Sequence, residues 1–190
     1  MSKAELRKGA REARRALAFQ TVVGLSEEIE RKLESLDEFK QSKVIAAYVS
    51  MIDEVQTERI IRTALNSHKR VLVPIVDPRN KKLIFSEIYD MSELAVSHFG
   101  IREPRPEFVR PVDLSEAKVI VVPVVAWDER GFRIGNGGGY FDKALAPLKG
   151  NLTVGLAFEA QRVNRVPEEN FDIPLKMIIT EKRILRFKRN

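Results

Sequence analysis

The chain has 190 residues, no cysteine and a formal net charge of +6. Its length suits one domain over residues 1–190, which would bury roughly 70% of its unfolded surface. The lack of cysteine excludes disulfides, thiolate metal sites and cysteine nucleophiles, and neither His68 nor His98 lies in a recognisable motif. No apolar stretch approaches the ~20 residues that cross a bilayer, so we expect a cytoplasmic protein without a membrane partner.

Two helices are predicted at the start of the chain. The first, from Ser2 to Phe19, is indicated by apolar residues at helical spacing: Leu6, Ala10, Ala13 and Leu17. Another face of this helix carries only basic residues: Lys3, Arg7, Arg11 and Arg14. By pattern alone this face is either solvated or anion-binding. The second helix should begin near Ser26, with Glu27 and Glu28 complementing its dipole.

Short apolar runs predict the strands: 43–50, 70–76, 82–88, 118–127, 152–158, 177–180 and 184–187. Further helices should begin after Thr57 and span Tyr140 to Leu148, while 92–111 reads as a loop. Alternating strands and helices indicate an α/β fold, a single three-layer α/β/α domain with a mostly parallel central sheet. Ligands of such sheets bind beyond the carboxyl ends of the strands, where the loops after 43–50 and 118–127 should meet.

The segment from Arg133 to Asp142 contains four glycines within five positions: Gly135, Gly137, Gly138 and Gly139. A loop of this kind lets backbone N–H groups approach phosphate oxygens, and the helix after it adds a positive end. A flexible turn is the alternative explanation. Neither common nucleotide fingerprint fits, because Tyr140 stands where a P-loop needs lysine and where the dinucleotide pattern needs glycine.

The run from Pro123 to Gly135, continued through Gly137, Gly139, Tyr140 and Asp142, resembles the signature of the 5-formyltetrahydrofolate cyclo-ligases, or methenyltetrahydrofolate synthetases. Further blocks match in order: Lys3 and Arg7, Ser50 to Thr57, Gly100 to Pro104, Gly155 to Glu159 with Gln161, Val166 and Pro167, and Asp172. The resemblance therefore extends over nearly the whole chain.

The resemblance implies a ligase of one-carbon metabolism that uses ATP and Mg²⁺ to cyclise 5-formyltetrahydrofolate to 5,10-methenyltetrahydrofolate. ATP would phosphorylate the formyl oxygen, N10 would attack the activated carbon, and ADP and phosphate would leave. The folate could carry a polyglutamate tail. We expect a monomer that binds no nucleic acid.

Each matching residue takes a role from the resemblance. ATP would be bound by Lys3, Arg7, Arg133, Ile134, Gly135, Asn136, Gly137, Gly138, Gly139, Tyr140 and Phe141. The folate would contact Val49, Glu54, Asn136, Gly137, Gly138, Gly139 and Tyr140. Arg133 and Glu54 would be catalytic, and Asp142 and Asp172 would hold Mg²⁺.

Some of these residues have a plainer explanation without the family. Val49 would be a core residue, Glu54 an acid at the start of a helix, and Asp142 a partner of a helix dipole. Tyr140 would either stack on the folate or lie under the loop. Phe171 stands where many family members have histidine, which puts proton transfer at that position in doubt.

Two other functions stay open at this point. A sugar-phosphate or CoA-ester enzyme of similar architecture would also use a glycine-rich loop, although it leaves Lys3, Arg7, Glu54 and Asp172 unexplained. A basic RNA-binding protein would suit the charge of +6. However, the basic residues are mixed with 27 acidic ones and are not interleaved with aromatic side chains.

Overall fold

The computed structural model describes residues 1–97 and 100–187, so His98 lies outside the described part. Within these residues seven strands form one sheet in the order β11-β10-β9-β6-β1-β2-β3. Their bounds are β1 Val44–Ala47, β2 Arg70–Asp77, β3 Lys82–Ile88, β6 Val119–Pro123, β9 Leu152–Leu156, β10 Met177–Ile179 and β11 Ile184–Arg186. The five inner strands are parallel, and β3 and β11 pair antiparallel at the edges. The predicted α/β class with a mostly parallel sheet is confirmed, with β6 at the centre.

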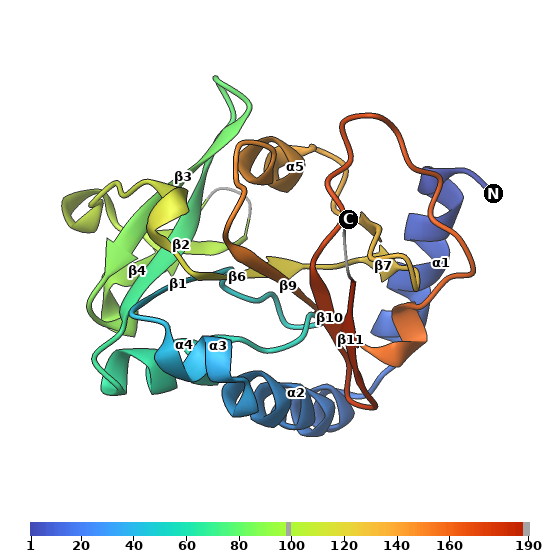
Figure 1. Cartoon of the computed structure of the whole chain (residues 1–190), viewed down its shortest axis with the longest axis horizontal. Coiled ribbons are helices and arrows are strands. Elements are labelled where there is room, and N and C mark those ends of the chain that lie inside the picture. Colours follow the sequence, from blue (N-terminus) through green and yellow to red (C-terminus); the bar gives the residue numbers. More distant parts are fainter. Residues whose placement is uncertain (98–99, 188–190) are drawn as a thin grey trace.

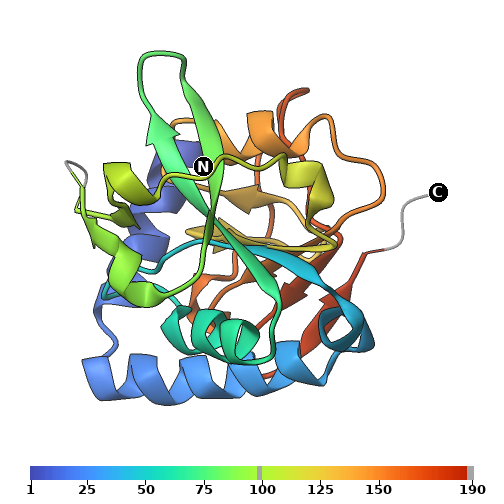
Figure 2. The ribbon, with the colours of Figure 1, turned by 90° about the vertical axis from the view of Figure 1, so that its left-hand side faces the viewer.

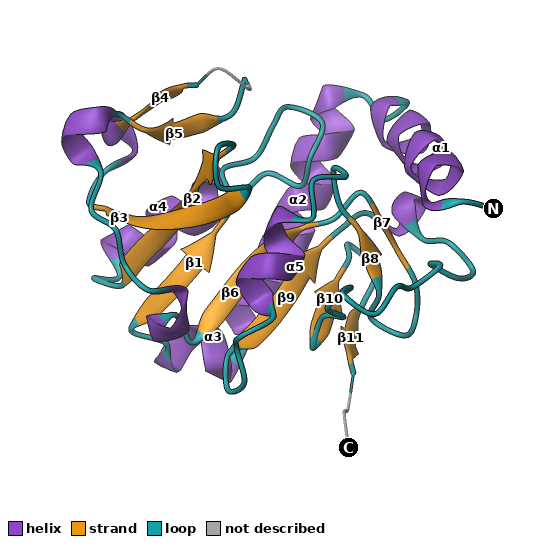
Figure 3. Ribbon diagram, turned by 90° about the horizontal axis from the view of Figure 1, so that it is seen from above, coloured by secondary structure: helices purple, strands orange, loops and turns teal. Residues whose placement is uncertain are grey.

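Helices cover both faces of this sheet (Figure 1). On one face lie α2 (Phe19–Ser35), α3 (Asp37–Gln41) and α4 (Glu58–Asn66), and on the other lies the short α5 (Tyr140–Leu145). Successive residues of a strand point to opposite faces, so Ile45 joins the core under α2 and α4 while Ala46 joins the core under α5. Viewed from above, β1, β6 and β9 point toward the side where α1 (Lys3–Arg15) lies (Figure 3).

The predicted strand 118–127 is divided in two. The main sheet keeps β6, whereas β7 (Ala126–Trp127) pairs with β8 (Arg133–Ile134) in a separate hairpin. At the break, the buried Gln161 donates from Nε2 to the carbonyl oxygens of Val124 and Val125 at 2.7 and 2.9 Å. This side chain satisfies the backbone where the chain leaves the sheet, which an apolar run alone does not reveal.

Other element boundaries also differ from the prediction. Helix α2 begins at Phe19 instead of near Ser26, because Val22 is buried in the core and extends the helical stripe backwards. Glu27 and Glu28 therefore lie within the helix, away from its dipole end. The segment expected as a loop at 92–111 contains a small hairpin, β4 (Leu94–Val96) with β5 (Arg102–Pro104). Among the described residues no helix has the length and apolar character needed to span a membrane.

Candidate active site

A cavity of ≈ 580 Å³ opens at the carboxyl ends of the parallel strands. Its wall includes every residue to which the sequence assigned a role: Lys3, Arg7, Val49, Glu54, Arg133, Ile134, Gly135, Asn136, Gly137, Gly138, Gly139, Tyr140, Phe141, Asp142 and Asp172. These fifteen residues come from four separate segments of the chain. The structure thus brings the predicted set together around one space, while the role of each residue remains a proposal.

The glycine-rich loop leaves the β7 and β8 hairpin and leads into α5. Gly137 has φ of +109° and Gly139, at the N-cap of α5, has φ of +64°, so both adopt conformations that favour glycine. The ring of Tyr140 packs against the backbone of Gly138 and also lines the cavity. Helix α5 ends at Leu145 instead of Leu148, so it has fewer aligned peptide dipoles than the prediction implied.

Helix α1 packs against this loop. Its N-terminus is fixed by a capping box between Ser2 and Glu5. Arg7 donates from Nε to the carbonyl oxygen of Gly135 at 2.9 Å, and Arg11 donates from Nη2 to Oδ1 of Asn136 at 2.8 Å. The basic face is therefore not a solvated stripe.

Helix α1 differs from the prediction in its end and in its buried face. It ends at Arg15 instead of Phe19, so Leu17 lies beyond it. Leu6 and Ala10 pack with Ile134 as expected. Ala13 is only partly buried, whereas Arg14, expected on the basic face, is buried. Arg14 has carboxylate partners at Asp53 and Glu54, which a helical period alone does not show.

The two acidic residues assigned to Mg²⁺ are each paired with a cation. Asp142 accepts from Arg133 at 3.1 Å, and Arg133 also donates to the carbonyl oxygen of Ile173 at 2.7 Å. Asp172 lies 2.5 Å from the Nζ of Lys3, which is also 2.6 Å from Glu169. Burial lowers the pKa of Lys3, but the hydrogen bonds to Asp172 and Glu169 outweigh this and raise the pKa. Within the described residues no group of three or more acidic, histidine or cysteine side chains forms a metal site.

Glu54 lies in the turn between β1 and α4. Its side chain is buried and accepts a hydrogen bond from the N–H of Met51 at 3.0 Å. Burial raises the pKa of Glu54, although the Met51 hydrogen bond and the charge of Arg14 oppose the rise. Glu54 does not start α4, which begins at Glu58, so that alternative is wrong. Thr57 occupies the N-cap position, but its hydroxyl donates to the carbonyl oxygen of Tyr48 and does not cap the helix.

Part of the cavity wall was missed from the sequence. The additional residues are Tyr48, Met51, Pro74, Val76, Leu83, Ile101, Glu103, Pro123, Val125, Glu169 and Phe171. Most are apolar and look like core residues in a sequence. Pro74 and Val76 had one available signal, because they stand near the carboxyl end of a predicted strand. Val49 is buried, as expected of a core residue, and it also lines the cavity, while its contact with the folate stays a prediction.

A mostly parallel sheet with a glycine-rich loop, basic side chains and carboxylates at its carboxyl edge is typical of α/β enzymes that bind anionic ligands. The chain belongs to the 5-formyltetrahydrofolate cyclo-ligase family, whose model matches residues 1–181. It is thus an enzyme of the ligase class, as the resemblance in its motifs predicted. Family membership favours a cyclo-ligase over the two alternatives, a sugar-phosphate or CoA-ester enzyme and an RNA-binding protein.

Individual relatives agree with this assignment. The chain is 34% identical over 144 residues to the 5-formyltetrahydrofolate cyclo-ligase of Haemophilus influenzae, covering 74% of this chain and 77% of the relative. It is 29% identical over 177 residues to the Escherichia coli K12 enzyme of the same name, covering 92% and 97%. The solution structure of Aquifex aeolicus 5,10-methenyltetrahydrofolate synthetase matches with a TM-score of 0.87 and 34% identity, covering 100% of this chain and 95% of that one.

Proposed function

We propose that the protein uses ATP and Mg²⁺ to convert 5-formyltetrahydrofolate into 5,10-methenyltetrahydrofolate, ADP and phosphate. The observation that carries this proposal is the gathering of all fifteen assigned residues around one cavity. In the reaction the γ-phosphoryl group of ATP moves to the formyl oxygen and ADP is released. N10 then forms a bond to the formyl carbon, the carbon–oxygen bond breaks, phosphate leaves, and N10 loses its proton.

This chemistry needs no protein nucleophile, so the task of the chain is to align two substrates and to balance charge. Lys3, Arg7 and the N–H groups of the glycine-rich loop would hold the phosphates of ATP. The guanidinium of Arg7 already lies beside this loop, because a Cβ added at Gly137 would be 3.6 Å from its Cζ. Arg133, which is buried between the loop and Asp142, would oppose the charge that develops during transfer.

Asp142 and Asp172 suit a magnesium ion that is shared with a nucleotide. Mg²⁺ is commonly held by one or two carboxylates together with phosphate oxygens, and the described part of the chain offers no larger acidic cluster. Both carboxylates line the cavity, so they can reach a ligand placed there. When bound, the ion would neutralise phosphate charge. Lys3 would then leave Asp172 and turn to the nucleotide.

The folate would occupy the part of the cavity that adjoins β1 and β2. Its apolar wall, which includes Val49, Pro74 and Val76, suits a flat ring system. Glu54 would accept hydrogen bonds from N–H groups of the pterin and so orient N10. A polyglutamate tail on the substrate, a monomeric state and a cytoplasmic location are further parts of this proposal.

The proposal is tested by mixing the purified protein with 5-formyltetrahydrofolate, ATP and Mg²⁺ and following the absorbance of the methenyl product. We expect product only when all three are present, with one phosphate released for each folate cyclised. A folded protein that binds ATP and forms no methenyl-folate would overturn the proposed function.

Replacing Glu54 with glutamine separates the two ends of the cavity. The Glu54→Gln variant should lose folate affinity and turnover while it binds a non-hydrolysable ATP analogue as the unmodified protein does. Titration calorimetry with the analogue and with folate measures both affinities. Equal losses for the two ligands would remove Glu54 from its proposed role.

A further inference from the structure

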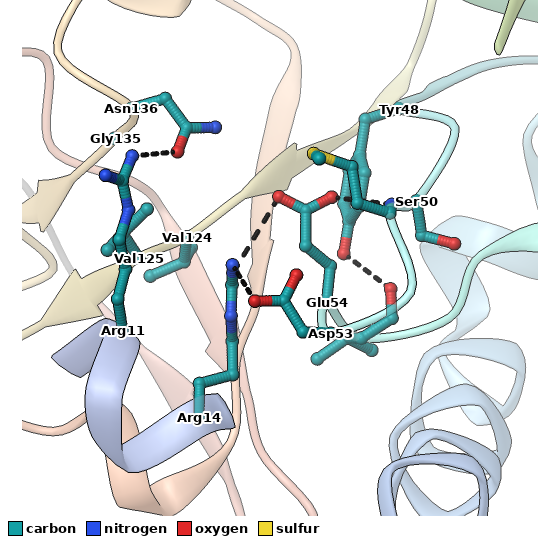
Figure 4. Close-up of polar contacts among 12 residues, drawn as sticks. Arg11, Arg14, Tyr48, Ser50, Asp53, Glu54, Val124, Val125, Gly135 and Asn136 are labelled. Carbon is teal, nitrogen blue, oxygen red and sulfur yellow. Dashed lines mark hydrogen bonds and ion pairs between the residues drawn. The ribbon is translucent and has the colours of Figure 1, made fainter. Parts of the chain in front are cut away.

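One face of α1 spans the distance between the glycine-rich loop and the turn that carries Glu54. Arg7 contacts the loop, as described above. Figure 4 shows Arg11 beside the loop at Asn136 and Arg14 beside the turn at Asp53 and Glu54. The Nη2 of Arg14 lies 2.9 Å from Oδ2 of Asp53, and its Nη1 lies 3.8 Å from Oε1 of Glu54. A single helix thus joins the two ends of the cavity.

Arg14 is unusual among the arginines of α1 because it is buried. Its side chain is 6% exposed, whereas that of the adjacent Arg15 is 71% exposed. Its Nε and Nη1 have no hydrogen-bond partner among the described residues. Burying a guanidinium with donors left unsatisfied is costly, and Arg14 does not itself line the cavity. Its effect on the site therefore has to pass through the carboxylates that it contacts.

We propose that Arg14 is a positioning residue that holds the Glu54 carboxylate in place and keeps it ionised for the folate, with Asp53 as the opposing charge. This inference rests on the proposed function of Glu54. It assigns to α1 a second task beyond contact with the nucleotide, which is to fix the folate carboxylate relative to the glycine-rich loop.

The charges around Glu54 act in opposite directions. Burial raises the pKa of Glu54 most, the charge of Asp53 raises it further, and the charges of Arg14 and Arg11 lower it. The neighbouring Tyr48 stays neutral, because burial and the charge of Glu54 raise its pKa. Removing the charge of Arg14 should therefore favour protonated Glu54, which would present a donor where the substrate offers donors. Removing the charge of Asp53 should favour the carboxylate.

The test is the pH dependence of kcat/KM for 5-formyltetrahydrofolate in four variants. In Arg14→Met the acid limb should move to higher pH, and in Asp53→Asn it should move to lower pH. Arg14→Lys, which keeps the charge, should move it less than Arg14→Met does. Arg15→Met is the matched control, since Arg15 also faces Asp53 at 3.6 Å but is exposed, and its limb should not move.

The KM values supply an independent measurement. Near the acid limb, Arg14→Met should raise the KM for folate on the order of tenfold while the KM for ATP changes by less than about twofold. A purely structural role would affect both substrates alike. If Arg14→Met does not fold, the inference is tested by the direction in which Asp53→Asn moves the acid limb. This variant should fold, because the Asp53 side chain is partly exposed and asparagine has the same shape.

Two results in folded Arg14→Met and Asp53→Asn would overturn the role of Arg14 while leaving the proposed function intact. The acid limbs could coincide with that of the unmodified protein, or both could move in the same direction. An unmodified protein that forms no methenyl-folate would overturn the proposed function first, and the role of Arg14 with it. The two failures are therefore distinguishable.

Discussion

The Nζ of Lys3 lies 2.5 Å from Oδ2 of Asp172, so a cation and a carboxylate proposed to serve the same nucleotide neutralise each other. Their side chains are 24% and 11% exposed, so water and salt screen the attraction between them less than in an ion pair on the surface. Binding of ATP with Mg²⁺ would exchange this contact for two others, from Lys3 to phosphate and from Asp172 to the metal. The pair would therefore link nucleotide binding to metal binding.

Asp172→Asn tests this link. Without Mg²⁺ the variant should bind an ATP analogue at least as well as the unmodified protein, because Lys3 has lost one competing carboxylate. Adding Mg²⁺ should raise the affinity of the unmodified protein for the ATP analogue. In the variant this increase should be smaller by roughly tenfold, or about 1.4 kcal/mol. Calorimetry in EDTA and in Mg²⁺ measures both values. The control is Glu169→Gln, which removes the other, exposed partner of Lys3 and should leave the Mg²⁺-dependent increase in affinity unchanged. Equal changes of this increase in the two variants would contradict a metal role for Asp172.

Arg7→Ala should weaken binding of the ATP analogue by roughly 1.5–3 kcal/mol, the range for a hydrogen bond to a charged group. The reason is the position of Arg7 against the glycine-rich loop, where its guanidinium faces the cavity. Arg15→Ala is the control from the same helix, and its effect should be near zero. Indistinguishable affinities for the two variants would mean that Arg7 serves only to dock α1.

Gly137→Ala should fold and yet lose most ATP-dependent activity. At φ of +109° an alanine is strained on the order of 1–3 kcal/mol, which a domain stability of roughly 5–15 kcal/mol tolerates. The added Cβ would lie 3.6 Å from Cζ of Arg7, in the space proposed for phosphate. Gly150→Ala is the control, because nothing lies within 4 Å of its Cβ position. Full activity with a lowered melting temperature would show that Gly137 only forms a turn.

Glu30 should make the protein less stable as the pH rises. Burial, followed by the charge of Glu34, raises the pKa of Glu30 from 4.5 to about 7. Below pH 4.5 the carboxyl is protonated in both the folded and the unfolded chain, and between 4.5 and 7 only the folded chain retains the proton. From this group the free energy of unfolding should therefore fall by up to about 3 kcal/mol between pH 4 and pH 8.

Glu30→Gln should remove this pH dependence and stabilise the protein at pH 8. Urea unfolding at several pH values measures the effect. Glu28→Gln, on the exposed side of the same helix, is the control and should leave the slope unchanged. A slope that survives in Glu30→Gln would assign the pH dependence to another group.

The sequence predicts the sheet well because buried parallel strands appear as short β-branched runs, and the run 118–127 contains β6. It also identifies the glycine-rich loop. It does not reveal the break after β6, which depends on a side chain from Gln161, distant in sequence. The predicted strands 70–76 and 82–88 pair as the hairpin of β2 and β3, which extends beyond the rest of the sheet (Figure 2).

The site is predicted less evenly. Charged and glycine residues attract notice in a sequence, so Arg133 and Asp142 were assigned, whereas apolar wall residues such as Leu83 resemble ordinary core. The burial of Arg14 was missed for a different reason. A helical period separates apolar from polar faces, but it does not tell which polar residue meets buried carboxylates of another segment.

The contacts of α1 also bear on the order in which the protein is assembled. Lys3 and Asp172 are separated by 169 residues, and Arg7 and Gly135 by 128. Closing loops of this length is entropically costly and comes after local structure has formed. During synthesis from the N-terminus Arg14 can meet Asp53 early, but Lys3, Arg7 and Arg11 have to wait for their partners until the glycine-rich loop and the segment around Asp172 have emerged. We therefore expect the nucleotide site to be acquired late in synthesis, and nascent chains that stop before the segment around Asp172 to lack ATP affinity even where the strands of the sheet have begun to pair.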